Sequence, residues 1–242
     1  MPDEIFQDPR LAPVYDPLDP DRSDLDAYVA IVEAVDATSV LDVGCGTGTL
    51  ACLLAGRGVA VVAVDPALAS LDVARRKPYA DRVQWIHGDA TTLPPVAVDA
   101  AVMTGNVAQV FLTDDEWFAT LRGIHGALRP HGWLVFETRV PSRRAWERWT
   151  PEFTRTTVDV DEVGVVEAWQ ELLDVDGELV TFRSMTWFER DDLLIESRST
   201  LRFRERSELD ASLAATGYNV VEIRDAPDRP GLEHVFVASR GR

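Results

Sequence analysis

The chain has 242 residues, of which 46% are hydrophobic and 27% charged, as expected for one large α/β domain or such a domain with a modest insertion. Its 24 basic and 41 acidic residues give a net charge of −17, and an acidic surface disfavours nucleic acids and anionic membranes as main partners. The two cysteines, Cys45 and Cys52, form neither a disulfide framework nor a metal-ligand spacing, which suits a reducing compartment.

The chain begins with an acidic segment, MPDEIFQDPR, that lacks the basic and apolar regions of a signal peptide. We therefore expect a cytoplasmic protein, and the longest apolar runs, such as Val59–Val64, are too short to cross a membrane. Residues 1–22 are rich in Pro and Asp and are expected to form an irregular arm. An amphipathic helix is expected from Ser23 to Val35.

Strands and helices then alternate for about a hundred residues, and short apolar runs indicate the buried strands. We expect strands at Val40–Val43, Val59–Val64, Val83–His87, Val98–Met103 and Trp133–Thr138. Helices are expected at Thr49–Ala55, from Asp65-Pro66 onward, and after the capping box Thr113-Asp-Asp-Glu116. Arg129-Pro130-His131-Gly132 reads as a turn. Such alternation predicts a parallel sheet with helices on both faces.

The pattern changes after Thr150, where runs of Val, Thr, Trp and Phe are separated by turn residues. Asp176-Gly177 is a hairpin signal, and residues 195–204 alternate strictly between two faces. Residues 151–204 are therefore expected to form an antiparallel β insertion of three or four strands before the last helix. The α/β domain would comprise residues 23–150 and 205–242, ending in a helix at Ser207–Ala215 and strands at Asn219–Arg224 and His234–Ser239.

The segment VLDVGCGTGTLA, in which a strand leads through Gly44, Gly46 and Gly48 into a helix, is the strongest signal in the chain. Glycine permits positive φ and lets a ligand approach the main chain without meeting a Cβ. Ligands in open α/β sheets bind at this carboxyl end of the strands. A dinucleotide fingerprint requires a glycine where Thr49 stands, so the G-x-G-x-G spacing disfavours that class.

Two acids follow the next two strands. Asp65 has the position of a carboxylate that accepts both ribose hydroxyls, and Asp89 could accept a hydrogen bond from an exocyclic adenine amine. Helix capping is the alternative reading for Asp65, since Pro66 follows it. The glycine loop and the two acids together nevertheless favour a nucleoside-binding site.

With these motifs, the sequence resembles a class I S-adenosylmethionine-dependent methyltransferase, most strongly over residues 23 to 140. The resemblance implies a Rossmann-like, seven-stranded, mostly parallel sheet with an antiparallel last strand. It implies S-adenosylmethionine as the methyl donor and S-adenosylhomocysteine as the product. The family usually has a second glycine where His131 stands, and we interpret His131 as a turn variant.

The resemblance also implies which residues bind the cofactor. The methionine portion would contact Asp42, Gly44, Cys45, Gly46, Thr47, Gly48 and Thr49, and the ribose would contact Asp65 and Pro66. The adenine would lie beside Asp89, Ala90 and Thr91, and the sulfonium near Thr104, Gly105 and Asn106.

Methyl transfer from a sulfonium is an in-line displacement with a good leaving group, so the protein must mainly align the acceptor and exclude water. We accordingly predict no metal, and the sequence leaves open which residue, if any, acts as a catalytic base. Enzymes that methylate amino groups of DNA carry an Asp/Asn-Pro-Pro-aromatic signature after the fourth strand, whereas this chain has Thr104-Gly105-Asn106-Val107. A small-molecule acceptor, methylated on nitrogen or oxygen, is therefore the leading hypothesis.

The candidate acceptor-binding residues flank the carboxyl edge of the sheet: Tyr15, Tyr28, Gln109, Arg139, Trp146 and Trp149, with Asn106 and Glu137 close by in sequence. The alternatives are that the tryptophans fasten the insertion to the core and that Arg139 pairs with a nearby acid. The insertion resembles lids or dimer surfaces of methyltransferases that act on amines, sugar-like compounds and natural products, which leaves a homodimer open.

Two other functions stay open at this point. An NAD-type dinucleotide-dependent oxidoreductase would also place a glycine loop after the first strand, although the third glycine of its fingerprint is missing. A non-catalytic protein could retain S-adenosylmethionine binding as a sensor or scaffold. Cofactor binding alone would not distinguish such a protein from an enzyme.

Overall fold

The alternating strands form one seven-stranded sheet, sheet A, in the computed structural model, which describes residues 3–241. Its strands are β1 (Ser39–Val43), β2 (Ala60–Asp65), β3 (Val83–His87), β4 (Val98–Met103), β5 (Leu128–Arg139), β10 (Tyr218–Asp225) and β11 (Glu233–Arg240), in the order β10-β11-β5-β4-β1-β2-β3. Strands β1 to β5 are parallel, whereas β11 is antiparallel to both β5 and β10. This confirms the predicted Rossmann-like sheet.

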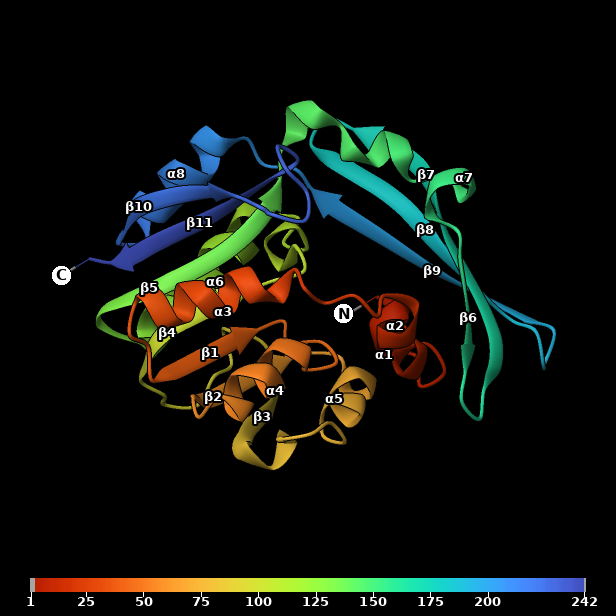
Figure 1. The fold of residues 1–242 in the computed structure, drawn as a ribbon. Coiled ribbons are helices and arrows are strands. Elements are labelled where there is room, and N and C mark those ends of the chain that lie inside the picture. The colour runs from red at the N-terminus through yellow and green to blue at the C-terminus, as the bar shows by residue number, and fades with distance from the viewer. Residues whose placement is uncertain (1–2, 242) are drawn as a thin grey trace.

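Helices cover both faces of sheet A because the strand residues alternate between two cores (Figure 1). Val40 of β1 packs on the side of α3 (Leu25–Ala34) and α4 (Thr49–Gly56). Leu41 packs on the side of α6 (Asp114–Ala127) and α8 (Arg206–Ala215). Among residues 3–241, no helix is long and apolar enough to cross a membrane.

The strand order places a topological switch between β1 and β4, because the chain runs from β1 to β2 on one side and returns to β4 on the other. The loop after β1 therefore lies where open α/β sheets bind ligands. Helix α5 (Leu68–Ala74) follows β2, and short 3-10 turns lie at Ala80–Arg82 and Val107–Gln109. Pro66 precedes α5 by two residues, so the prediction that Asp65-Pro66 opens this helix was wrong.

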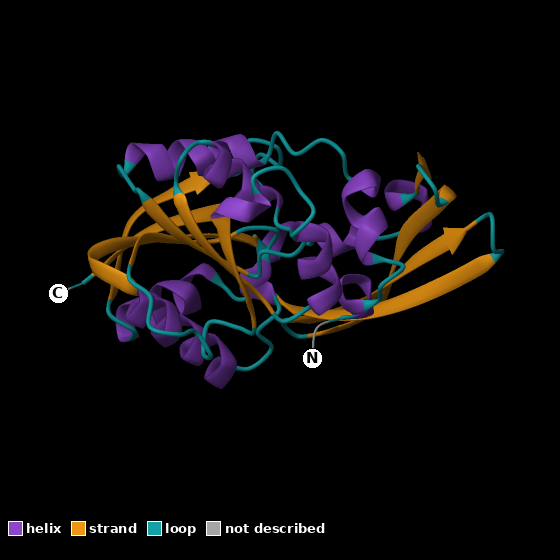
Figure 2. Cartoon of the chain, turned by 90° about the horizontal axis from the view of Figure 1, so that it is seen from below, coloured by secondary structure: helices purple, strands orange, loops and turns teal. Residues whose placement is uncertain are grey.

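Residues beyond β5 form a four-stranded antiparallel sheet, sheet B, with the order β6-β7-β8-β9. Turns at Pro141–Arg143 and Ala145–Arg148 and helix α7 (Pro151–Thr154) lead into β6 (Thr156–Val160), β7 (Gly164–Asp176), β8 (Leu179–Phe188) and β9 (Leu193–Arg202). Its long strands extend away from sheet A (Figure 2). The predicted hairpin at Asp176-Gly177 joins β7 to β8, with Gly177 at φ 58°. The exact bounds proposed for the insertion, 151–204, stay a prediction.

The amino-terminal arm is helical where the composition predicted an irregular segment, so that expectation was wrong. It contains α1 (Glu4–Gln7) and α2 (Ala12–Leu18), which lie beside sheet B in Figure 1. Asp8 begins the turn into α2, because its Oδ1 accepts a hydrogen bond from Arg10 N at 2.7 Å. Leu11 and Val14 then pack against sheet B. This distant packing outweighs Pro17 inside α2, whereas Pro13 lies in the first turn, where proline is tolerated.

Strand β5 begins earlier than expected, since residues 129–132 lie within it rather than in a separate turn. The pairing with β4 jumps from Leu128 to Trp133, so these four residues form a bulge. His131 adopts a positive φ of 65° there, in keeping with its interpretation as a turn variant. The prediction of a turn was therefore right about the local backbone and wrong about the break in the strand.

Candidate active site

The three alternate glycines after β1 have different surroundings, although all have positive φ, from 51° to 75°. A Cβ on Gly44 would lie 2.6 Å from a methyl group of Val107, and one on Gly48 would lie 2.5 Å from the Trp85 ring. A Cβ on Gly46 would meet no atom of the described residues within 4 Å. Gly44 and Gly48 are therefore needed for packing, and Gly46 exposes main chain to open space.

The carboxylate of Asp65 reaches back from the end of β2 to this loop. Its Oδ2 accepts a hydrogen bond from Gly46 N at 2.8 Å, and its Oδ1 accepts one from Ala67 N at 2.7 Å. The side chain is buried, and desolvation raises the pKa of the carboxyl above its usual value. Asp65 thus organises both the loop and the turn into α5. Each oxygen has a further lone pair with which a ligand hydroxyl could bond.

Asp42 lies at the end of β1 and is 1% exposed, in contrast to the open face at Gly46. Its Oδ2 has no hydrogen-bond partner among residues 3–241. Burial, followed by the nearby Asp65 charge, raises the pKa of Asp42 to about 7. Burial also raises the pKa of the Cys45 thiol, so Cys45 does not have the lowered pKa of a reactive cysteine.

The predicted adenine-side residues form a tight turn after β3. Asp89 is exposed, and its Oδ1 accepts hydrogen bonds from Thr91 N at 2.8 Å and Thr91 Oγ1 at 2.6 Å. Ala90 is 2% exposed and packs in the core on the α6 side, so its side chain holds the turn in place. This arrangement leaves Asp89 at the surface, in the turn after β3, which neighbours the strand that ends in Asp65.

The segment after β4 combines an open glycine with a buried amide. Gly105 is exposed at φ 70°, and a Cβ there would also meet no described atom within 4 Å. Asn106 is 3% exposed; its main-chain N donates to Glu137 Oε1 at 3.0 Å and its Nδ2 donates to Glu233 Oε1 at 3.1 Å. Asn106 Oδ1 has no hydrogen-bond partner within the described chain. Thr104 precedes this turn at the end of β4 and is half-buried.

Tyr28, a predicted acceptor-binding residue, instead lies in the core. It is 3% exposed, and its hydroxyl donates a hydrogen bond to Glu137 Oε2 at the end of β5. Burial, and next the charge of Glu233, raise the pKa of Glu137 to about 7. Tyr28 thus positions a buried carboxyl group, and its part in acceptor binding stays a prediction.

Arg139, at the end of β5, pairs with an acid, which was the alternative reading of this residue. Its Nε lies 3.6 Å from Glu233, and its Nη1 donates to Gln109 Oε1 at 3.0 Å. The guanidinium also lies over the Trp149 ring, 5.5 Å from its centre. Glu233 is 2% exposed and has a second cationic partner in Arg229 at 2.8 Å.

The two predicted tryptophans belong to the apolar cluster under sheet B. The Trp146 ring meets the Phe203 ring edge-on at 4.6 Å between centroids, and Trp149 lies at the same distance from Phe182. Both are less than 10% exposed. They therefore fasten sheet B to the end of β5, which is the packing alternative; only Trp149 also contacts a charged candidate, Arg139.

Two residues that the motifs did not reveal, Asp16 of the arm and Lys77 after α5, also contact the glycine loop. Asp16 Oδ1 accepts a hydrogen bond from Thr47 Oγ1 at 2.7 Å, and Asp16 Oδ2 lies 2.6 Å from Lys77 Nζ. Lys77 Nζ also donates to Thr49 Oγ1 at 2.6 Å. Tyr15, the neighbour of Asp16, packs against Phe6 with ring centroids 5.6 Å apart. Neither Asp16 nor Lys77 stands in a motif, so only their spatial contacts with the glycine loop identify them.

Sequence comparison identifies relatives of the region that contains these motifs. Residues 40–132 match the model of the family described as methyltransferase domain. A cypemycin N-terminal methyltransferase from Streptomyces sp is 37% identical over 117 residues, which cover 48% of this chain and 48% of that protein. The chain thus spans about half the length of this curated relative.

Structural comparison extends the similarity to nearly the whole chain. The CcbJ methyltransferase from Streptomyces caelestis has a TM-score of 0.77 at 22% identity, with 98% of this chain and 97% of that chain covered. CalS10 from Micromonospora echinaspora is an amino pentose methyltransferase solved with S-adenosylmethionine bound. It has a TM-score of 0.70 at 24% identity, with 90% of this chain and 92% of that chain covered. At these identities the likeness establishes a shared fold, sheet B included.

Proposed function

We propose that the chain is a class I S-adenosylmethionine-dependent methyltransferase and that it transfers the methyl group to a nitrogen or oxygen atom of a small molecule. The methyltransferase-domain match of residues 40–132 and the fold shared with CcbJ support this proposal. One observation carries this proposal: the Asp65 carboxylate lies 2.8 Å from the main-chain N of Gly46, the loop glycine that faces open space. The carboxylate that we expect to bind the nucleoside and an unobstructed stretch of main chain thus lie next to each other at the topological switch point of the sheet.

The residues around the loop fit an adenosyl-sulfonium. Asp65 retains accepting capacity for the two ribose hydroxyls, and Gly46 and Gly105 both leave open space where a side chain would otherwise stand. The partnerless Oδ1 of Asn106 provides a further acceptor beside Gly105. Asp89, with Thr91 holding its Oδ1, is our proposed partner for the adenine amine.

When bound, S-adenosylmethionine supplies a methyl group on a positively charged sulfur, which is already a good leaving group. The chain's contribution is then to hold the cofactor, to orient the acceptor and to exclude water from the site. Asp65 and Gly46 hold the nucleoside end, while Asp16 of the arm fastens α2 over Thr47 of the loop. We assign sheet B the part of a lid, because Trp149 connects its apolar cluster to Arg139.

An amine nitrogen is the acceptor atom that we favour. The Streptomyces relative is an N-terminal methyltransferase, and CalS10 acts on an amino pentose. An amine needs no activated nucleophile once it is unprotonated, which agrees with a site lacking a nucleophilic motif. Tyr15, Gln109 and Arg139 are the side chains that we propose to orient such an acceptor.

Calorimetry with the purified chain tests the cofactor assignment. We expect S-adenosylmethionine and S-adenosylhomocysteine to bind, and Asp65→Ala to lose at least about tenfold in affinity through the lost charged hydrogen bonds. Asp72→Ala is the matched control, since Asp72 is an exposed acid on α5 that pairs with Arg75 at 2.9 Å. Equal cofactor affinity in the two variants would refute the role of Asp65.

An acceptor library then distinguishes an enzyme from a non-catalytic binder. Primary and secondary amines, alcohols and phenols are incubated with labelled S-adenosylmethionine, and methylated products are identified by mass spectrometry. Uptake of NAD without uptake of S-adenosylhomocysteine would instead indicate a dinucleotide-dependent oxidoreductase.

A further inference from the structure

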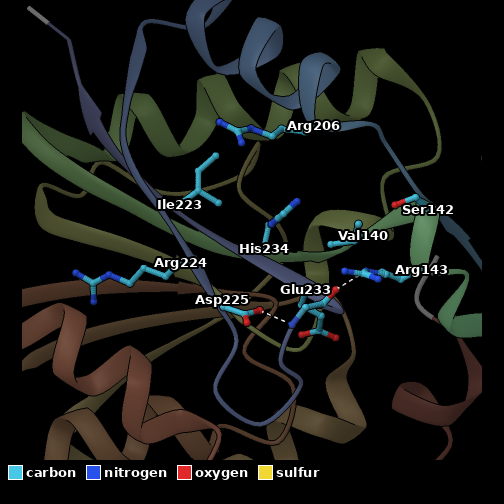
Figure 3. Close-up of a pocket in the computed structure, with 10 residues that line it drawn as sticks. Val140, Ser142, Arg143, Arg206, Ile223, Arg224, Asp225, Glu233 and His234 are labelled. Atoms are coloured by element: carbon cyan, nitrogen blue, oxygen red, sulfur yellow. Dashed lines mark hydrogen bonds between the residues drawn. The ribbon is translucent and has the colours of Figure 1, made fainter.

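A separate hollow of about 410 Å³ opens beyond the end of β5 (Figure 3). Three arginines and one histidine are among the residues that line it: Arg143 after β5, Arg206 at the start of α8, Arg224 near the end of β10, and His234 near the start of β11. We call these four residues and the space between them the arginine basin. They come from four different parts of the chain, so only the fold brings them together.

The arginine basin lies at the same edge of sheet A as the candidate active site. Strand β5 ends there, and β11 begins there because it is antiparallel to β5. Glu233 also lines the hollow, and it contacts Arg139 at 3.6 Å and Asn106 Nδ2 at 3.1 Å. Glu233 therefore connects the basin to the site at which we place the acceptor. The basin lies on the side of β5 away from the glycine loop.

The acids in the hollow already have partners. Glu233 is paired with Arg139 and, at 2.8 Å, with Arg229. Asp225 Oδ1 accepts a hydrogen bond from Gly231 N at 2.7 Å. The charge of Glu233 is therefore balanced, whereas Asp225 keeps its negative charge, which the three arginines of the basin outnumber.

The arginines, by contrast, retain donors for a ligand. Arg143 uses its Nε on the carbonyl oxygen of Gly231 at 3.0 Å and forms no ion pair with any acid of residues 3–241. Arg206 pairs with Asp210 at 3.5 Å and Arg224 with Glu222 at 2.8 Å, and all four of these side chains are at least 40% exposed. Exposed pairs of this kind contribute little free energy, so a multiply charged anion can compete for both arginines.

Size and charge together indicate the ligand class. A hollow of about 410 Å³ is within the usual range for small-molecule sites. Guanidinium groups bind the oxygens of phosphate in pairs, and several of them around one space suit a multivalent oxyanion better than a single carboxylate. In a chain with a net charge of −17, such a cluster also gives an anionic ligand one favourable place to dock.

We propose that the arginine basin binds a phosphate or diphosphate group of the methyl acceptor, at a distance from the atom that is methylated. This inference rests on the proposed methyltransferase function. It implies that the acceptor is a phosphate ester, anchored beyond β5 while its reactive end lies beside Arg139 and Gln109. Binding energy at the remote anchor then orients the reactive end.

Calorimetric titration with inorganic pyrophosphate at constant ionic strength tests the basin directly. We expect binding by the full chain, weakened about tenfold or more by Arg143→Ala and by Arg206→Ala. Arg206→Ala is the second variant because Arg143 also holds the Gly231 carbonyl, whereas the Arg206 side chain is 60% exposed. Arg57→Ala, at the end of α4, is the matched control and should change the affinity less than twofold.

The same titration repeated with S-adenosylhomocysteine present locates the anion. We expect both ligands to bind together, since the basin and the glycine loop are on opposite sides of β5 and β4. Displacement of S-adenosylhomocysteine by pyrophosphate, absence of pyrophosphate binding, or equal affinity in Arg143→Ala, Arg206→Ala and Arg57→Ala would each overturn the proposal. Binding of pyrophosphate through Arg143 in a chain that takes up no S-adenosylmethionine would refute the proposed function and leave the anion site standing.

Discussion

Glu137 and Glu233 are two buried carboxyl groups that share one hydrogen-bonding partner, Asn106. Glu233 is balanced by Arg139 and Arg229. Glu137 instead accepts hydrogen bonds from neutral donors, among them the Tyr28 hydroxyl and the main-chain N of Asn106, and it forms no ion pair among residues 3–241. Burying a carboxylate without a cationic partner favours its protonated form. Burial accordingly raises the pKa of Glu137 to about 7, so this carboxyl group titrates near neutral pH.

This raised pKa makes stability depend on pH. Below about pH 4.5, Glu137 is protonated in both the folded and the unfolded chain; between about pH 4.5 and 7, only the folded chain keeps the proton. The free energy of unfolding therefore falls as pH rises through this window, by about 3 kcal/mol when the shift is fully expressed. Glu137→Gln keeps the shape of the side chain but cannot ionise. We therefore expect the free energy of unfolding of this variant to fall less with rising pH than that of the parent chain, as measured by thermal unfolding from pH 5 to pH 8.

Asp42 contributes a decline of the same sign, because its pKa is also raised to about 7. Glu137→Gln should consequently flatten the pH profile without abolishing its slope. Glu147→Gln, at an exposed acid that pairs with Arg144, serves as the control and should leave the profile unchanged. A Glu137→Gln profile that matches the control would show that Glu137 is ionised throughout.

Helix α6 shows how one element positions part of the site. The capping box predicted at its start is present: Thr113 Oγ1 accepts from Glu116 N at 3.2 Å, and Glu116 Oε2 accepts from Thr113 N at 3.0 Å. Further along, a Cβ on Gly123 would lie 2.0 Å from the carbonyl oxygen of Ala90. The helix can approach the turn that carries Asp89 this closely only because residue 123 lacks a side chain.

The two glycines of α6 therefore provide a matched pair of substitutions. Gly123→Ala should destabilise the protein by about 1–3 kcal/mol, because the helix and the Ala90 main chain must separate. Gly126→Ala, in the same helix, would meet no described atom within 4 Å and should stabilise the protein by up to about 1 kcal/mol. Thermal unfolding of both variants measures the difference, and equal stability would contradict the close contact at Gly123.

Across the whole molecule, the arm connects parts that are otherwise separate. Leu11, just before α2, and Val14 of α2 pack against Val166 and Phe188 of sheet B, while Asp16 binds Thr47 of the glycine loop. Ser70 of α5 also donates a hydrogen bond to the carbonyl oxygen of Phe6, at 2.8 Å. The arm thereby couples the position of sheet B to that of the loop.

Removing the polar part of this connection should loosen α2 without unfolding sheet A. We expect Asp16→Ala to increase hydrogen exchange of the α2 amides by roughly tenfold, since the carboxylate bonds both Thr47 and Lys77. Asp19→Ala changes an exposed acid one residue beyond α2 and should leave exchange unchanged. If exchange is as slow in Asp16→Ala as in Asp19→Ala, apolar packing alone holds the arm.

The sequence by itself determined those features that depend on neighbouring residues. Apolar runs marked strands β3 and β4 at their observed bounds, Thr113 and Glu116 marked the start of α6, and Asp176-Gly177 marked a hairpin. Strand–helix alternation predicted sheet A, because parallel strands need helical crossovers. The glycine loop and Asp65 could likewise be placed, since the carboxyl ends of neighbouring parallel strands share one edge.

Only the tertiary structure decided which side chains meet across that edge. Tyr28 bonds Glu137 over a separation of 109 residues, and Asn106 bonds Glu233 over 127. Val107 and Trp85, which lie far from the loop in sequence, make Gly46 the loop glycine that faces open space. Such contacts arise when separate elements pack together, and the periodicity of one element carries no record of its distant neighbours. The helical arm and the arginine basin depend on the fold for the same reason.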